Sequence, residues 1–372
     1  MATNWPTSDA VTSLAQSLAV GSSTGDRSAA GRLGLVVIVL LLVAAAGISV
    51  TTGASDASFG HVVASWLGHA NAADASLTRD RIIIMDIRLP RMVLGALVGA
   101  ALAVSGAILQ GLFRNPLADP GLVGVSSGAG LGAVLVIVLG SALLGPLFAV
   151  AGLYALPFAA FLGGLASTFL LYGIATRRGQ TAIATMLLAG IALGALAAAL
   201  TGLLVYRAND TQLRDITFWS LGSLAGSDWT KVLAAGPFMA LALAATPFLA
   251  NGLNAMSLGE ASAYHLGVPV QRLKAIAIFA VAGATGAAVA VSGGIGFVGI
   301  VVPHLLRLTI GPDHRLLLPG SALLGASFLL VADAISRSIA APAELPIGIV
   351  TAMVGGPFFL WLLLRRRGLL GT

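Results

Sequence analysis

The stretch IRLPRMVLGALVGAALAVSGAILQGLF, residues 87–113, decides the fold class of this chain. It contains no Asp, Glu, Lys or Arg between Arg91 and Arg114, and small residues recur along it. A helix needs about 20 mostly apolar residues to cross the hydrocarbon core of a bilayer. The stretch therefore predicts a transmembrane helix, and its small residues predict close packing against neighbouring helices.

The rest of the chain has the same character. Of its 372 residues, 58% are hydrophobic and 9% are charged, and the mean hydropathy is +0.98. A soluble domain carries roughly 25% charged residues. A membrane β-barrel would show alternating apolar and polar residues in segments of about 10 residues, and no such segments are visible. We therefore expect an all-α polytopic membrane protein.

Apolar runs that are long enough to span recur along the chain and predict ten transmembrane helices. They lie at residues 33–51, 91–113, 121–140, 148–175, 182–206, 231–250, 270–292, 295–310, 316–338 and 346–364. The transmembrane domain then occupies residues 33–367. The polar N-terminal tail, residues 1–32, is expected to be disordered, and residues 368–372 form a short C-terminal tail.

The arginines at both ends of the chain predict the orientation. An even number of spans places both termini on the same side of the membrane. Arg365, Arg366 and Arg367 follow the last span, and Arg27 and Arg32 precede the first. Because Lys and Arg concentrate on the cytoplasmic side, both termini are expected in the cytoplasm.

Several activities are excluded by what the sequence lacks. The chain has no Cys, so neither disulfides nor thiolate metal sites can form. The phosphate-binding motif G-x-x-x-x-G-K-[ST] is absent, so any ATP hydrolysis through this motif belongs to another chain. The net charge of +6 comes without a basic and aromatic patch, and nucleic acid is therefore not an expected partner.

A short polar segment, MSLGEASAYHLGVP at residues 256–269, interrupts the apolar pattern. Ser257 and Glu260 have the S-x-x-E spacing of a capping box, and Gly267 and Pro269 can end a helix. The pattern predicts a helix of two to three turns along the cytoplasmic surface. It is either an ordinary interfacial connector or a docking element for a motor protein.

Two other segments stand out at the ends of spans. RNPLADPGLVGVSSGAG, residues 114–130, is rich in turn residues and predicts a tight cytoplasmic reversal followed by close helix packing. Arg88, Arg91 and Arg337 are predicted at the outer rim. Interfacial snorkelling would explain them, and so would ion pairs with carboxylates of a partner.

The longest motifs together resemble one family. They are RLPRMVLGALVGAALAVSGAILQGLFRNPLADPGLVGVSSGAGLGA, SLGEASAYHLGV, GFVGIVVPHLLRL, DHRLLLPGSALLGASFLLVADAISR and ELPIGIVTAMVGGPFFLWLL. In this order they resemble the FecCD family, the permease subunits of ABC importers for ferric siderophores, haem and cobalamin. The resemblance covers about residues 80–367.

The resemblance implies an assembly and a location. The expected fold is the BtuC-like permease fold, with short coupling helices between spans six and seven, in the bacterial inner membrane. Two copies of the permease are expected to form a homodimer, with two ATPase subunits on the cytoplasmic face. A periplasmic binding protein would deliver the substrate to a pathway lined mainly by the fifth and tenth spans, with help from the third and eighth.

The resemblance also implies roles for particular residues. The coupling residues would be Ser257, Leu258, Gly259, Glu260, Ala261, Ser262, Tyr264, His265, Leu266 and Gly267. Arg88, Arg91 and Arg337 would receive glutamates of the binding protein. No catalytic residue is expected, because the chain would be a transport subunit and not an enzyme.

The substrate is expected to be haem. ADPGLVGVSSGAG and NDTQLRDITFWSLGSLAGSDW resemble the haem-importing branch most, while a ferric siderophore or cobalamin stays open. Tyr206 and Arg207, at the outer end of the fifth span, could meet a haem ring and a propionate, or be interfacial anchors. No histidine is predicted at mid-membrane. We therefore expect no metal site and no permanently bound cofactor, and ATP only on the partner ATPase.

Two other function classes compete with this interpretation. A secondary carrier would work without an ATPase and commonly holds an acidic residue at mid-membrane. An intramembrane enzyme would need convergent side chains such as Ser with His. Ser126 and Ser127 are present, but no His or Asp is predicted at their depth.

Overall fold

The computed structural model describes residues 28–53, 55–66, 75–143, 152–341 and 343–367. Residues 1–27 of the predicted N-terminal tail 1–32 and the predicted C-terminal tail 368–372 lie outside the described residues. The elements of the first half are α2 (Ser28–Thr51), α3 (Phe59–Trp66), α4 (Ala75–Ile82), the π-helical η1 (Ile83–Arg88), α5 (Leu89–Phe113), η2 (Pro120–Val123), α6 (Val125–Leu143), η3 (Gly152–Tyr154), α8 (Ala155–Ala175), β1 (Thr176–Arg177), β2 (Gln180–Thr181) and α9 (Ile183–Arg207). Those of the second half are α10 (Asp210–Ser220), α11 (Trp229–Ala244), α12 (Thr246–Ser257), α13 (Glu260–His265), α14 (Val270–Ser292), α15 (Val298–Thr309), α16 (His314–Ile339) and α17 (Ile347–Arg367).

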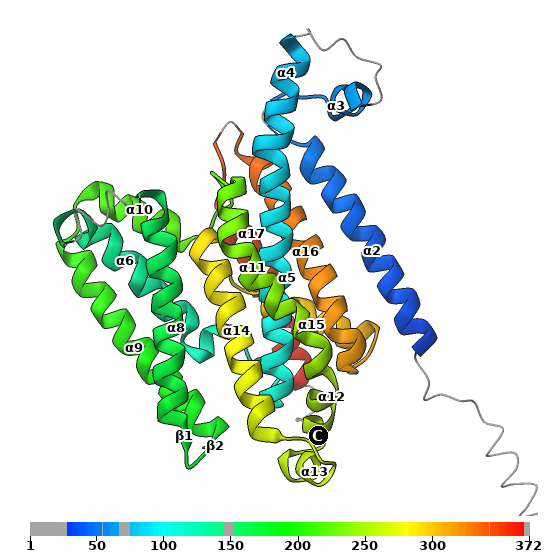
Figure 1. The fold of residues 1–372 in the computed structure, drawn as a ribbon, viewed down its shortest axis with the longest axis vertical. Helices are drawn as coiled ribbons and strands as arrows, with labels where there is room; N and C mark the ends of the chain where they lie inside the picture. Colours follow the sequence, from blue (N-terminus) through cyan, green and yellow to red (C-terminus); the bar gives the residue numbers. More distant parts are fainter. Residues whose placement is uncertain (1–27, 54, 67–74, 144–151, 342, 368–372) are drawn as a thin grey trace, which may run out of the picture.

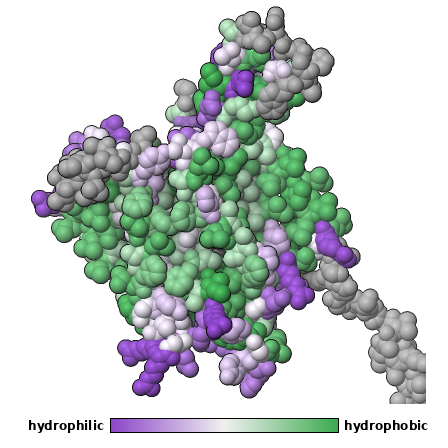
Figure 2. All heavy atoms as spheres, viewed as in Figure 1, coloured by the Kyte–Doolittle hydropathy of each residue, from purple (hydrophilic) through white to green (hydrophobic). Residues whose placement is uncertain are grey.

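Six helical segments within these described ranges are long and apolar enough to cross a membrane. They are Gly31–Thr51, Ala75–Phe113, Ala155–Ala175, Ile183–Arg207, Val270–Ser292 and His314–Ile339. The pair α11 and α12 also qualifies as one span bent by 46°, and Val125–Gly140, Val298–Thr309 and Ile347–Leu362 are shorter apolar helices. Figure 2 shows an apolar belt around the visible face, with polar residues above and below it. The prediction of an all-α polytopic membrane protein is confirmed.

The helices form a bundle around α5 (Figure 1). α5 packs against α16, α14, α15 and α11, and most of its side chains are buried. α6, α8, α9 and α10 form a second group at one side, joined to the rest through α14. α13 lies at one end of the bundle and α4 at the other, and we call these ends the α13 end and the α4 end.

Glycines let the backbone of α5 approach its neighbours. A Cβ atom added at Gly99 would overlap the carbonyl oxygen of Gly325 in α16, and one added at Gly106 would overlap that of Gly299 in α15. Membrane helices lack a hydrophobic driving force between them and depend on such close contacts. The small residues that identified this stretch as a span therefore also position its two partners.

This packing leads to a first prediction. Gly106→Ala is expected to lower the free energy of unfolding in detergent by about 1–3 kcal/mol, because its Cβ would overlap backbone that cannot move as a side chain can. Thermal unfolding of the purified chain measures this loss. Gly47→Ala in α2, where a Cβ would meet nothing within 4 Å, is the matched control and should keep its melting temperature. Equal melting of both variants would contradict the proposed packing.

Three chain breaks meet where α10, α14 and α17 end or begin. The Ser223 amide donates to the Ser292 carbonyl oxygen at 2.7 Å, and the Ile347 amide to that of Gly222 at 3.0 Å. Gly222 and Gly293 have φ values of +71° and +69°, which glycine adopts without strain. Irregular backbone inside a membrane protein must find its hydrogen bonds within the protein, and these breaks do so by bonding to one another.

Several predicted boundaries differ from those in the structure; the span 231–250, for example, corresponds to the bent pair α11 and α12. α2 begins at Ser28, so residues 28–32 are helical and not part of a disordered tail. The segment after α5 reverses the chain as predicted, and Asp119 within it returns into the bundle. A Cβ on Gly299 would lie 3.3 Å from the Asp119 Oδ2, and Gly299 packs on Gly106 well inside α5. The turn residues predicted a reversal correctly, but they carry no information on its depth.

Candidate functional site: a surface helix and a buried arginine cluster

α13 projects from the α13 end of the bundle, between α12 and α14 (Figure 1). It is a helix of 6 residues, shorter than predicted. Ser257 is the last residue of α12, and its Oγ donates to the Asn254 carbonyl oxygen at 2.6 Å. The residue that precedes α13 is Gly259, which offers no side-chain cap. The predicted capping box is therefore wrong, because α12 continues to Ser257.

The outer surface of α13 and its flanks is exposed and partly apolar. Leu258, Tyr264 and Leu266 are 67%, 72% and 65% exposed. The exposed set also includes Ser257, Ala261, Ser262, His265 and Gly267. Only Ala263 of α13 is fully buried, and it fixes the helix to the bundle. Large apolar side chains on a polar end of a membrane protein are typical of a contact surface for another protein.

Glu260 joins α13 to the bundle through an ion pair. Its Oε1 lies 2.7 Å from the Nζ of Lys274 in α14. Lys274 is almost completely buried, and its Nζ also donates to the Thr181 carbonyl oxygen at 2.8 Å. The buried ammonium group thus contacts two different elements besides its own helix.

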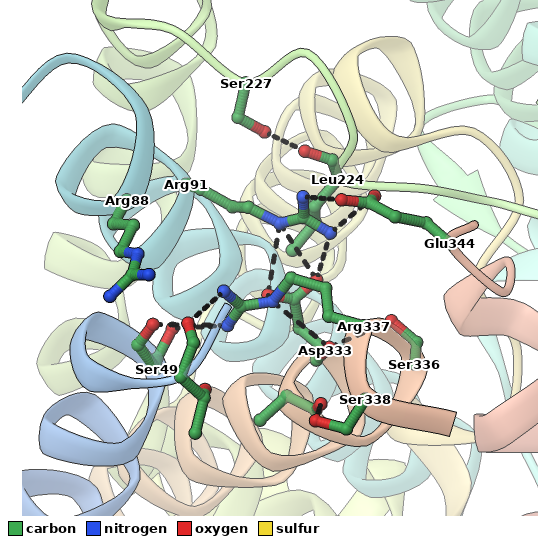
Figure 3. A network of polar contacts seen from close by, with 12 residues as sticks. Ser49, Arg88, Arg91, Leu224, Ser227, Asp333, Ser336, Arg337, Ser338 and Glu344 are labelled. Atoms are coloured by element: carbon green, nitrogen blue, oxygen red, sulfur yellow. Dashed lines mark hydrogen bonds and ion pairs between the residues drawn. The ribbon is translucent and has the colours of Figure 1, made fainter. Parts of the chain in front are cut away.

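The arginine cluster lies toward the α4 end and is centred on Asp333 of α16 (Figure 3). The Arg91 Nη2 lies 2.8 Å from the Asp333 Oδ1, and the Arg337 Nε lies 3.0 Å from its Oδ2. Arg91 also donates to both carboxylate oxygens of Glu344, at 2.8 and 3.0 Å. Two arginines and two carboxylates therefore form a neutral network that joins α5, α16 and the segment before α17.

Arg88 and Arg337 also hold the end of α2. Arg88 donates to the carbonyl oxygens of Val50 and Thr51 at 2.9 and 3.0 Å, and Arg337 donates to that of Thr52 at 2.9 Å. The last carbonyl groups of a helix lack partners within the helix and carry partial negative charge. The two arginines satisfy these groups for α2.

Arg88, Arg91 and Arg337, which were predicted at the outer rim, make these contacts inside the subunit. All three are buried, and their guanidinium groups have partners within the subunit. Arg88 reaches toward α2, whereas Arg91 reaches toward α16 (Figure 3). A role in docking a partner stays a prediction.

Tyr206 and Arg207 end α9 and are both exposed. Neither lines the apolar cavity of about 530 Å³ beside the chain breaks. That cavity is lined by Ser220, Leu221, Gly294, Gly296, Phe297, Gly348, Ile349, Ala352 and Met353. It thus lies between the ends of α10 and α14 and the beginnings of α15 and α17, at the depth of the chain breaks.

No group of three or more His, Asp or Glu side chains that could hold a metal ion occurs within the described ranges. His304 is buried in α15 and its ring contacts Phe358 edge-on at 5.8 Å. His314 begins α16, and its Nδ1 lies 2.8 Å from the Asn254 Oδ1. Both contacts are those of structural histidines.

Sequence reasoning assigned no role to Asp333, Glu344 and Lys274. The spacing of four residues between Asp333 and Arg337 was a usable signal, since such pairs share a helix face. Lys274 lies within the predicted span 270–292, where a charge needs a partner, and this was a second usable signal. Glu344 carried no local signal, because its partner Arg91 is 253 positions away.

Comparison with known proteins identifies the family. The model of the FecCD transport family matches residues 38–365. The chain belongs to the FecCD transport family. It is therefore a transport protein and not an enzyme, as its motifs predicted.

Relatives in this family carry different cargoes. The chain is 50% identical to the hemin transport system permease protein HmuU of Yersinia pestis over 77% of this chain and 84% of that protein. It is 48% identical to the cobalamin import system permease protein BtuC of Halobacterium salinarum, covering 77% and 74%. It is 43% identical to the vitamin B12 import system permease protein BtuC of Escherichia coli, covering 78% and 86%.

A solved structure shares the fold as well. It is described as an inward-facing conformation of a metal-chelate type ABC transporter, and it matches with a TM-score of 0.76 and 34% identity, covering 89% of this chain and 98% of that one. The resemblance inferred from the motifs is confirmed. The prediction of an ABC permease fold is confirmed as well.

Proposed function

We propose that this FecCD-family chain is the permease subunit of an ABC importer that moves haem from the periplasm to the cytoplasm. The observation that carries the proposal is the exposed surface of α13 on a chain without its own nucleotide-binding motif. Transport driven by ATP then requires a separate ATPase, and α13 offers the contact surface. The 50% identity to a hemin permease supports haem.

The proposed subunit spans the bacterial inner membrane ten times. Six long helices, the bent pair α11 and α12, and the shorter α6, α15 and α17 supply these crossings. With ten crossings both termini lie in the cytoplasm, and the α13 end faces the cytoplasm too. Two copies form a homodimer, two ATPase subunits bind the α13 ends, and a periplasmic binding protein binds the α4 ends.

Uptake into proteoliposomes tests this proposal. The chain is reconstituted with the ATPase and binding protein encoded beside it, and haem, a ferric siderophore and cobalamin are offered in parallel. We expect haem uptake that requires both ATP and the binding protein. Uptake of haem without ATP would favour a secondary carrier instead.

Cobalamin import is the second candidate function, and the 48% identity to a cobalamin permease favours it. Cobalamin is bulkier than haem and lacks its two propionates. The cavity lined by Phe297 and Met353 is apolar, so it suits the face of either macrocycle. ATP-driven uptake of cobalamin but not haem would support the proposed ABC importer and assign cobalamin as its substrate.

Docking of the binding protein makes a separate prediction at Glu344. A partner carboxylate can bind Arg91 only if it displaces Glu344, because Glu344 accepts hydrogen bonds from two of the guanidinium nitrogens. The Glu344 side chain is 38% exposed, so a partner can reach it. Glu344→Ala is expected to raise the affinity for the binding protein several-fold, measured by surface plasmon resonance on nanodiscs. Electrostatic contacts of this kind act strongly on the association rate.

Asp215→Ala, which removes an exposed carboxylate of α10, is the control for net charge. It should change the affinity far less than Glu344→Ala. Equal affinities for Glu344→Ala and the unchanged chain would remove Arg91 from the docking surface and leave the cluster a purely structural role.

A further inference from the structure

Lys274 occupies an unusual position between the proposed ATPase contact and the bundle. It lies in the first two turns of α14 and is 1% exposed, yet it carries an ammonium group. Its Nζ contacts the Glu260 Oε1 at 2.7 Å and the Thr181 carbonyl oxygen at 2.8 Å. A buried ammonium group needs partners of this kind, because removing it from water without them is strongly unfavourable.

The two partners of Lys274 belong to two different elements, α13 and β2. Glu260 is the first residue of α13. Thr181 lies in β2, in the hairpin that joins α8 to α9, and α9 begins two residues later at Ile183. The Thr181 amide donates to the Gln271 Oε1 of α14 at 2.9 Å, so both backbone groups of Thr181 are held by side chains of α14.

α13 and α9 have the freedom that a transmitted movement requires. Gly259 and Gly267, with φ values of +110° and +81°, flank α13 and provide pivots at both of its ends. In the most apolar stretch of α9, 11% of the residues are buried within the subunit, against 78% in the segment Ala75–Phe113, which contains α5. Packing within the subunit therefore holds α9 less firmly than α5. The hydrogen bonds of Thr181, two residues before α9 begins, therefore help to position this end of the helix.

We propose that Lys274 is a positioning residue that transmits displacement of α13 to the α8–α9 hairpin and so to α9. The inference rests on the proposed function, in which an ATPase moves α13. When α13 is displaced, Glu260 draws the ammonium group, and the hydrogen bond to Thr181 carries this movement to the beginning of α9. Because the group is buried, breaking the contact with Glu260 leaves a charge without its ion-pair partner, and breaking the contact with Thr181 leaves a buried donor unpaired, so the three elements move together.

Lys274→Met tests this link, since Met keeps most of the buried volume and removes the charge. Arg272→Met, an exposed cation of the same helix, is the matched control. The complete complex with ATPase and binding protein is reconstituted, and both ATP hydrolysis and uptake are measured. We expect Lys274→Met to assemble and hydrolyse ATP normally, while uptake per ATP hydrolysed falls about ten-fold or more.

Glu260→Gln is the second variant, and it tests the link through Lys274 if Lys274→Met does not fold. Gln still fits the half-exposed site but loses the ion pair, so uptake per ATP is expected to fall by a smaller factor. The double variant Glu260→Gln/Lys274→Met should be no worse than Lys274→Met alone, because both remove the same link.

A distance measurement distinguishes transmission from a merely structural role. The chain has no Cys, so spin labels can be placed specifically at Ser262→Cys and Arg178→Cys, both exposed. In the unchanged complex the distance between α13 and the hairpin should stay constant when ATP binds. In Glu260→Gln the distribution of distances between the two labels should broaden when ATP binds.

Two results would overturn the inference and are separable from failure of the proposed function. Uptake per ATP that is unchanged in Lys274→Met, or in Glu260→Gln where Lys274→Met does not fold, would reject the link. A label distance that does not change in Glu260→Gln would reject it too. If the unchanged chain shows no ATP-driven uptake at all, the proposed function itself fails.

Discussion

Asp333→Ala is expected to lower the free energy of unfolding by about 3–5 kcal/mol, because it removes the carboxylate that two buried arginines share. Arg91 and Arg337 remain buried after the change, and Glu344 is paired with Arg91 and not with Arg337. The loss also reaches α2, since Asp333 positions the Arg337 side chain that bonds to the Ser49 and Thr52 carbonyl oxygens. Chemical unfolding in detergent, followed by tryptophan fluorescence, measures the effect.

Two variants separate charge from shape in this prediction. Asp333→Asn keeps the volume but loses the charge and replaces one acceptor oxygen with an NH2 donor, which cannot pair with a guanidinium group, so we expect a loss nearly as large as that of Ala. Ser338→Ala, on the same helix, loses only a hydroxyl that donates to its own helix and should stay within about 0.5 kcal/mol of the unchanged chain. A loss below about 1 kcal/mol for Asp333→Ala, the value typical of an exposed pair, would contradict a structural cluster.

The cluster shows what hydropathy can and cannot predict. The bounds of α14, Val270–Ser292, equal the predicted span 270–292, because that span begins after Pro269 and ends before a pair of glycines. Arg91 lies near the beginning of α5 and Arg337 near the end of α16, as the predicted spans placed them. Their burial was missed because Arg91 and Asp333 are 242 positions apart, and no local pattern records which side chain lies opposite.

The surface helix shows the same limit on a smaller scale. The polar segment 256–269 was recognised as a short helical interruption, and α13 lies within it. Its beginning was wrong because Ser257 can either cap the next helix or end the previous one. The choice depends on α12 packing through Leu253 and Met256, both fully buried, and this contact keeps the chain helical to Ser257.

The correct beginning of α13 also determines which residues test docking. Glu260 is paired with Lys274, so a charge reversal there would break an internal contact together with any external one. Tyr264 and Leu266 point outward and are 72% and 65% exposed, so changes there leave the subunit nearly intact. We expect Tyr264→Asp and Leu266→Asp to change the stability of the free permease by less than about 0.5 kcal/mol.

Leu266→Asp is expected to abolish ATP-driven uptake by preventing assembly with the ATPase. A hot-spot side chain at the centre of an interface contributes about 2 kcal/mol or more, and a carboxylate buried there without a partner is strongly unfavourable. Co-purification of the ATPase with the tagged permease in detergent measures the loss directly, and uptake into proteoliposomes measures its consequence. Leu266→Met and Tyr264→Phe keep the apolar surface and should retain both assembly and uptake.

If Leu266→Asp still co-purifies with the ATPase and supports full uptake, the exposed face of α13 is an interfacial connector and the ATPase contacts the permease elsewhere. Loss of uptake with intact co-purification would instead mean that Leu266 is not needed for assembly with the ATPase. Its side chain would then be needed to transmit the movement of the ATPase to α13.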